Sequence, residues 1–112
     1  MRRELLVTTL AFLALWLGLM VFGRSALLKD PGCFWHVAVG QRMLDTGRLV
    51  REDPFSFPRD GHPWVPHQWL AELGMAAAHG AGGLDALVLL AAVVLAATYA
   101  GVTRRLLRDG LH

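Results

Sequence analysis

The sequence predicts an all-α membrane protein, in which two transmembrane helices form an antiparallel hairpin and are joined by a partly helical, aromatic-rich extracytoplasmic loop. Hydrophobic residues make up 54% of the 112 residues and charged residues 18%, whereas soluble domains are usually about 45–50% apolar and about 25% charged. The apolar residues form two blocks, Leu5 to Phe22 and Leu84 to Val102, each long enough to cross a hydrocarbon core about 30 Å thick. The prolines, the histidines other than the last residue, and most charges lie between these blocks.

Five segments follow from this pattern. We expect a cytoplasmic N-terminus at 1–4, a first transmembrane helix at 5–23, an extracytoplasmic loop at 24–83, a second transmembrane helix at 84–103 and a cytoplasmic tail at 104–112. Arg2 and Arg3 are typical of the start of a signal peptide, but the apolar run after them exceeds the ~7–15 residues of a signal-peptide core. The first block is therefore expected to be an uncleaved anchor.

The distribution of arginines predicts the orientation. The two ends of the chain carry five arginines against two acidic residues, whereas the loop and the entry of the second block carry six basic residues against seven acidic ones. Short arginine-rich flanks stay on the cytoplasmic side of a membrane. Both termini are therefore expected in the cytoplasm and the loop on the outer side of a bacterial inner membrane. Nucleic acid is not an expected partner, because the sequence has no basic stripe with interleaved aromatic residues.

Small residues at four-residue spacing offer a way to pack the two spans. Apolar burial does not drive helix association in lipid, so close backbone approach at small residues matters instead. The stripes are Ala11, Ala14 and Gly18 in the first span, and Ala92, Ala96, Ala100, Ala97 and Gly101 in the second. They are expected to face each other or further helices outside this chain. Alternatively, alanine is simply abundant in such helices.

Two short helices are expected in the loop, at about 31–46 and 66–79. Asp30 and Pro31 are typical of a helix start, and Gly47 is typical of a C-terminal cap. Four prolines between Leu49 and Pro66 exclude a regular helix there, and Arg59-Asp60-Gly61 predicts a turn. The glycines at 80, 82 and 83 are expected to end the second short helix.

An ordered series of loop residues resembles a known group of proteins. The series reads Asp30-Pro31-x-x-Phe34-Trp35-His36-x3-Gly40-x2-Met43-Leu44-x2-Gly47, then Asp53-Pro54-Phe55-Ser56-Phe57, then Gly61-x2-Trp64-x2-His67-Gln68-Trp69-Leu70. It is similar to the first extracytoplasmic loop of uncharacterised bacterial polytopic membrane proteins. Those proteins are grouped by fold with the GT-C glycosyltransferases, which use lipid-linked sugars. The resemblance covers nearly the whole chain and implies an N-terminal fragment of such an enzyme.

The resemblance also implies catalytic candidates. GT-C enzymes place an acidic residue just beyond their first span, where it takes the proton of the acceptor. By position this candidate general base is Asp30, and Asp53 is the second candidate. Related proteins commonly have Asp-x-Asp at this place, but Gly32 occupies the second place here. That departure weakens the case for a divalent metal, and no metal site or other cofactor is predicted.

Four further residues are candidates for substrate binding. His36 and His67 can orient a substrate phosphate or sugar hydroxyls, and Trp64 and Trp69 can stack on sugar rings. Structural roles explain the same residues: Asp30 as a helix cap, the histidines as hydrogen-bonding members of an aromatic cluster, and the tryptophans as anchors at the membrane interface.

Besides a secreted or anchored binding module, two functional hypotheses remain open. The first is the N-terminal part of a GT-C-like glycosyltransferase, inactive alone because two spans enclose too little space for a lipid-linked sugar. The second is a two-span structural or accessory subunit whose loop docks a partner. The partners expected under these hypotheses are the lipid bilayer, a lipid-linked sugar, and further transmembrane helices or subunits.

Overall fold

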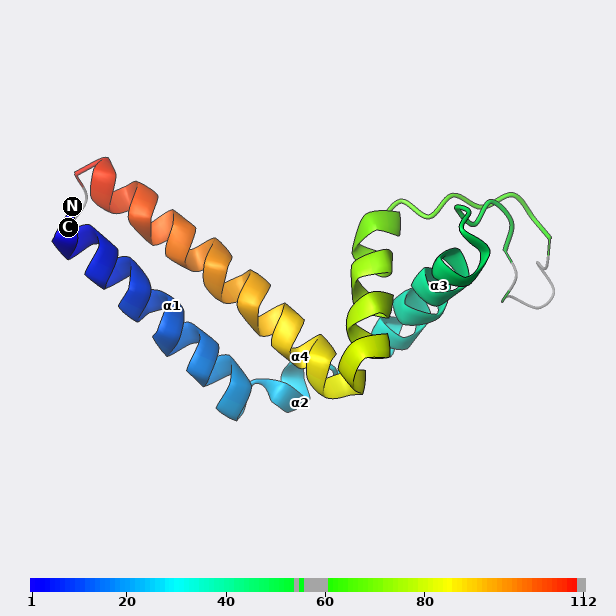
Figure 1. Cartoon of the computed structure of the whole chain (residues 1–112), viewed down its shortest axis with the longest axis horizontal. Coiled ribbons are helices and arrows are strands. Elements are labelled where there is room, and N and C mark those ends of the chain that lie inside the picture. Colours follow the sequence, from blue (N-terminus) through cyan, green and yellow to red (C-terminus); the bar gives the residue numbers. More distant parts are fainter. Residues whose placement is uncertain (54, 56–60, 111–112) are drawn as a thin grey trace. The chain divides into compact units, whose positions relative to one another are not determined.

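A computed structural model of the chain describes residues 1–53, 55 and 61–110 (Figure 1). The described residues form four α-helices and no strand. The helices are α1 (Arg2–Phe22), α2 (Arg24–Leu27), α3 (Gly32–Thr46) and α4 (Trp69–Arg108). The all-helical prediction is confirmed at this level. Most of the turn predicted at Arg59-Asp60-Gly61 lies outside the described residues.

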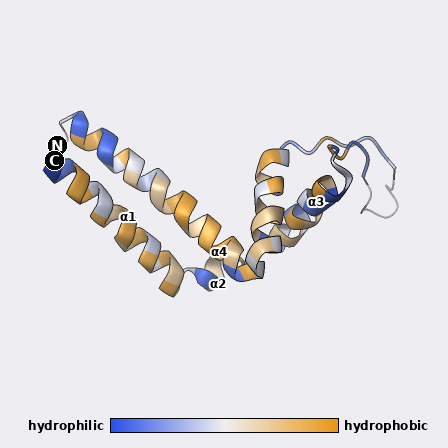
Figure 2. Ribbon diagram, in the orientation of Figure 1, coloured by the Kyte–Doolittle hydropathy of each residue, from blue (hydrophilic) through white to orange (hydrophobic). Residues whose placement is uncertain are grey.

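Two helices are long and apolar enough to cross a membrane. These are α1 and α4, and apolar residues dominate α1 and much of α4 in Figure 2. In α1, a run of leucine, alanine and other apolar residues without proline supports an uninterrupted helix. Glu4 lies in the first turn, where its negative charge interacts favourably with the positive end of the helix dipole. The helix begins three residues before the expected span and ends at Phe22, with Gly23 as its C-terminal cap.

The chain divides into two compact units, and α4 contributes to both. The first unit combines Met1–Lys29 with Val88–His112, and the second is Asp30–Leu87. In the first unit, Met1 and Leu107 line the same surface groove, so the first turn of α1 lies beside the last turns of α4. Figure 1 likewise shows the start of α1 beside the end of α4.

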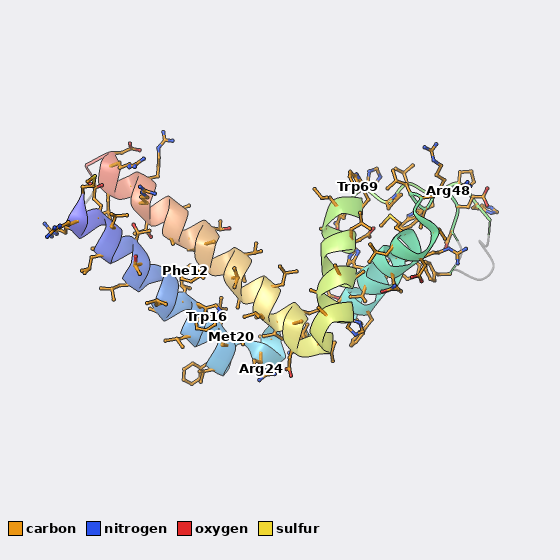
Figure 3. The ribbon with its side chains drawn as sticks, in the orientation of Figure 1. Phe12, Trp16, Met20, Arg24, Arg48 and Trp69 are labelled. Carbon is orange, nitrogen blue, oxygen red and sulfur yellow. The ribbon has the colours of Figure 1, made fainter. Side chains whose placement is uncertain are left out.

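The alanine stripe of α4 is the buried face of the first unit. Ala92 and Ala96 are fully buried and Ala100 is 5% exposed. Three residues of the predicted stripes are exposed and do not belong to the packed faces, namely Ala97 and Gly101 of α4 and Ala14 of α1. Larger residues of α1, namely Phe12, Trp16 and Met20, are partly buried instead and follow one face of the helix (Figure 3). Ala11 and Gly18 of the predicted α1 stripe are partly buried as well.

In the second unit, α3 begins and ends at local hydrogen bonds. The Oδ1 of Asp30 accepts a hydrogen bond from the backbone N–H of Gly32 at 2.8 Å, which satisfies one of the unpaired donors of a helix start. At the other end, Gly47 adopts a left-handed conformation with φ 64°. Its N–H donates to the carbonyl of Met43 at 2.9 Å. Glycine takes this conformation without steric strain.

Part of the segment between α3 and α4 folds back on itself. Residues 51–53 pair with residues 62–64 in antiparallel fashion: Trp64 N–H donates to the Arg51 carbonyl and Asp53 N–H to the His62 carbonyl, both at 2.9 Å. This pairing brings Val50 against α3. Val39, Met43 and Val50 form a buried core, with Trp64 and Leu73 packed against it.

The fourth helix differs from the expectation at both ends and in its middle. It begins at Trp69, three residues after the expected start at Pro66. Helical residues continue beyond Gly80, and the backbone becomes non-helical at Gly82 (φ −158°, ψ 21°) and Gly83 (φ 66°, ψ −148°). After this break the helix runs to Arg108, five residues beyond the expected end of the second span. The side chain of Arg105 donates to Asp109 at 3.2 Å near that end.

Candidate functional site

The candidate site lies where α3 crosses the first turns of α4, within the second unit. Gly40 is the point of closest approach. A Cβ atom at this position would overlap the backbone carbonyl oxygen of Glu72 and would lie 2.9 Å from the Cβ of Ala76. Only a residue without a side chain permits this crossing, and the crossing buries the face of α4 that carries Glu72.

Glu72 is the one buried charged residue among those that the structure describes, with 2% exposure. Its Oε1 lies 2.9 Å from Nδ1 of His36 on α3. Its Oε2 is buried and has no hydrogen-bond partner among the described residues. A buried carboxylate is costly unless it is paired and hydrogen-bonded. The contact with His36 therefore satisfies part of that requirement.

His36 reaches Glu72 because of its position on the helix. His36 and Gly40 are four residues apart on α3, so both lie on the face that meets α4. Glu72 and Ala76 have the same spacing on α4. The His36 side chain keeps 34% exposure, against 3% for that of Glu72. The pair thus joins a buried carboxylate to an imidazole that remains open to solvent.

A cluster of aromatic rings is built on the residue next to His36. The Trp35 ring contacts Phe55 edge-on at 5.0 Å between centroids, and Trp64 at 6.2 Å. Edge-to-face contacts of this kind contribute beyond simple burial. Through Trp64, the cluster connects the loop to the core around Val39. The position of Trp64 is therefore explained by packing, and nothing in its position supports the predicted stacking on a sugar ring.

The other predicted site residues are dispersed. Asp30 is exposed, and one of its oxygens caps α3. Asp53 is partly exposed, and its Oδ1 accepts a hydrogen bond from Phe55 N–H at 3.0 Å. His67 is exposed in the turn before α4. Trp69, 42% exposed, begins the helix (Figure 3). Within the described part of the chain, no three His, Cys, Asp or Glu side chains gather as metal ligands.

Glu72 is the site residue that sequence reasoning missed. In the sequence it is one of the acidic residues of the loop, and its position on the predicted helix is a signal of burial. Leu73 and Ala76 mark the buried face of the helix, and Glu72 falls on that same face as its single acidic residue. An acidic residue inside an apolar stripe requires a partner. The partner could not be read from the sequence, because His36 lies 36 residues away.

Comparisons with protein-family models, with curated proteins and with solved structures found no match. A carboxylate can hold an imidazole in one orientation, which leaves the second ring nitrogen to contact a polar group.

Proposed function

We propose that this chain is an integral membrane protein with two spans, oriented with both termini in the cytoplasm and with Asp30–Leu87 on the outer side of a bacterial inner membrane. The single observation that carries the proposal is the length and apolar character of α1 and α4. The buried alanine stripe supports it further, because small residues are the usual contacts between helices in lipid. Two hydroxyls of α4 are also internally satisfied: Thr98 donates to the Val94 carbonyl at 2.8 Å and Thr103 to that of Tyr99 at 2.9 Å.

Reporter fusions test the orientation. A periplasm-active reporter inserted at Gly61 is expected to be active, and one fused after Asp109 inactive. A cytoplasm-active reporter at the same two positions is the control and should give the opposite pattern. Activity of one reporter at both positions would contradict the proposed antiparallel hairpin.

Within this arrangement, we propose that the chain supplies two spans and an outer unit to a GT-C-like glycosyltransferase that uses a lipid-linked sugar, and that it is inactive alone. The proposal rests on the resemblance of the loop series. The state of Asp30 is compatible with it: Oδ1 is engaged by Gly32, while Oδ2 has no hydrogen-bond partner among the described residues. The exposed carboxylate of Asp30 thus has an oxygen free to take the proton of an acceptor.

Replacing Asp30 with asparagine separates catalysis from capping. Asparagine caps helices about as well as aspartate, so the abundance of the protein should stay unchanged while the negative charge is lost. We expect sugar transfer from lipid-linked donors, measured in membranes that contain the complete assembly, to fall by roughly 100-fold or more. Asp45→Asn is the matched control, because Asp45 is exposed and its side chain accepts a hydrogen bond, among the described residues, only from Gln41, at 2.8 Å. Unchanged sugar transfer by Asp30→Asn would contradict a catalytic role for Asp30 and leave it only the role of helix cap.

A second candidate function is an accessory subunit whose outer unit docks a partner. It is favoured by large apolar side chains that the second unit leaves exposed: Phe34 at 57%, Val65 at 65% and Leu70 at 68%. The two candidates are distinguished by the same assay. The accessory function requires that Asp30→Asn is tolerated and that Leu70→Glu disrupts the assembly, whereas the transferase function requires loss of transfer by Asp30→Asn in an intact assembly.

A further inference from the structure

Glu72 is buried where a hydrophobic residue would fill the same space without the cost of desolvating a charge. Gly40 and Ala76 lie next to Glu72 where the two helices cross, and neither residue has a polar side chain. The nearest polar side chain is that of His36, at 2.9 Å. Replacing a buried ionic group by an apolar one often preserves or raises stability. Packing alone therefore does not explain a glutamate at this position.

The geometry selects one nitrogen of the imidazole. Nδ1 faces Oε1 of Glu72, and a carboxylate oxygen accepts hydrogen bonds, so the proton of the neutral ring belongs on Nδ1. Nε2 then keeps its lone pair. No hydrogen bond of Nε2 exists among the described residues, and the side chain is 34% exposed. His36 consequently presents an acceptor to solvent at a fixed orientation.

We propose that Glu72 is a positioning residue that holds His36 in the Nδ1–H tautomer, and that Nε2 of His36 accepts a hydrogen bond from a hydroxyl group of a sugar ligand. Glu72 itself does not touch the ligand, because it is buried beneath His36. The tautomer is inferred from the contact of Nδ1 with a carboxylate oxygen, which accepts hydrogen bonds, whereas the choice of a sugar hydroxyl rests on the proposed function. The proposal assigns to Glu72 a role that none of the predicted site residues carries.

Nuclear magnetic resonance tests the tautomer directly. The full chain, labelled with ¹⁵N-histidine and placed in lipid nanodiscs, is expected to give the Nδ1–H pattern for His36 at neutral to mildly alkaline pH. Glu72→Gln should remove this preference, because its amide offers both a donor and an acceptor to the ring. Glu52→Gln is the matched control, since Glu52 is exposed in the same unit. An Nε2–H pattern in the wild-type chain overturns the proposal, whether or not the variant folds.

Carbethoxylation by diethylpyrocarbonate tests the exposed nitrogen and its ligand. The reagent attacks an unprotonated ring nitrogen, so His36 should be modified at Nε2 in the wild-type chain. We expect slower modification of His36 in Glu72→Gln, because the amide no longer holds the ring with Nε2 unprotonated. Equal rates in both chains would show that Glu72 does not position the ring.

The ligand is tested separately with n-octyl β-D-glucoside, added below its micelle-forming concentration. The glucoside should protect His36 from modification in the wild-type chain and leave exposed His62 and His79 unprotected. Protection of all three histidines, or of none, overturns the assignment of a sugar hydroxyl. Because neither the tautomer nor the protection requires glycosyl transfer, their outcomes are independent of the Asp30→Asn assay.

Discussion

Replacing Gly40 with alanine is expected to destabilise the second unit by about 1–3 kcal/mol, the usual cost of adding atoms to a tightly packed site. The added Cβ would overlap the carbonyl oxygen of Glu72 and press on the Cβ of Ala76. Neither atom is the flexible end of a side chain, so α3 and α4 have to separate. Separation would also lengthen the contact between His36 and Glu72. Denaturant unfolding of the full chain in detergent, followed by the fluorescence of Trp64 in a variant that retains only this tryptophan, measures the change.

Gly74→Ala is the matched control for this substitution. Gly74 lies in α4, and a Cβ there would meet no atom within 4 Å. Alanine favours a helix over glycine by roughly 0.5–1 kcal/mol, so Gly74→Ala should stabilise the same unit. If Gly40→Ala also stabilised it, α3 and α4 would not cross at Gly40 in the folded protein.

Replacing Ala96 with leucine is expected to destabilise the first unit by a similar amount, about 1–3 kcal/mol. Ala96 is completely buried in the middle of the alanine stripe of α4. A leucine at this position needs space that the packed face around Ala96 does not offer. The loss of helical circular dichroism during titration with a denaturing detergent measures the change.

Ala97→Leu provides the comparison for Ala96→Leu. Ala97 is the next residue along the helix and is exposed, so the same added side chain would extend into lipid in the proposed membrane arrangement. Its effect on unfolding should be small. Equal destabilisation by the two variants would contradict burial of the stripe formed by Ala92, Ala96 and Ala100.

Local chemistry explains which parts of the fold could be predicted from the sequence. The end of α3 follows from Gly47, whose left-handed conformation is open to glycine at no cost. Its start follows from Asp30, although the observed helix begins at Gly32 and the side chain caps it from two residues upstream. The stripe from Ala92 to Ala100 follows from four-residue periodicity. Each of these signals lies within a few residues of the feature that it predicts.

Features that depend on residues distant in the sequence were not predictable in the same way. Gly40 has no local requirement for glycine, and its reason is the carbonyl of Glu72 on another helix. Likewise, the burial of Glu72 depends on how α3 packs against it. The candidate site was therefore predicted only in part: His36 is a predicted site residue, but its contact with Glu72 is not part of the prediction.

The conformation of Gly83 has a stereochemical consequence. Its φ of 66° and ψ of −148° are the mirror image of an extended conformation that L-residues adopt freely. A D-alanine introduced by chemical synthesis would fit this backbone, whereas any of the other nineteen encoded residues would be strained there. At position 83, the backbone conformation that interrupts α4 thus suits a residue of D configuration or glycine. Glycine is the only one of these that the genetic code provides.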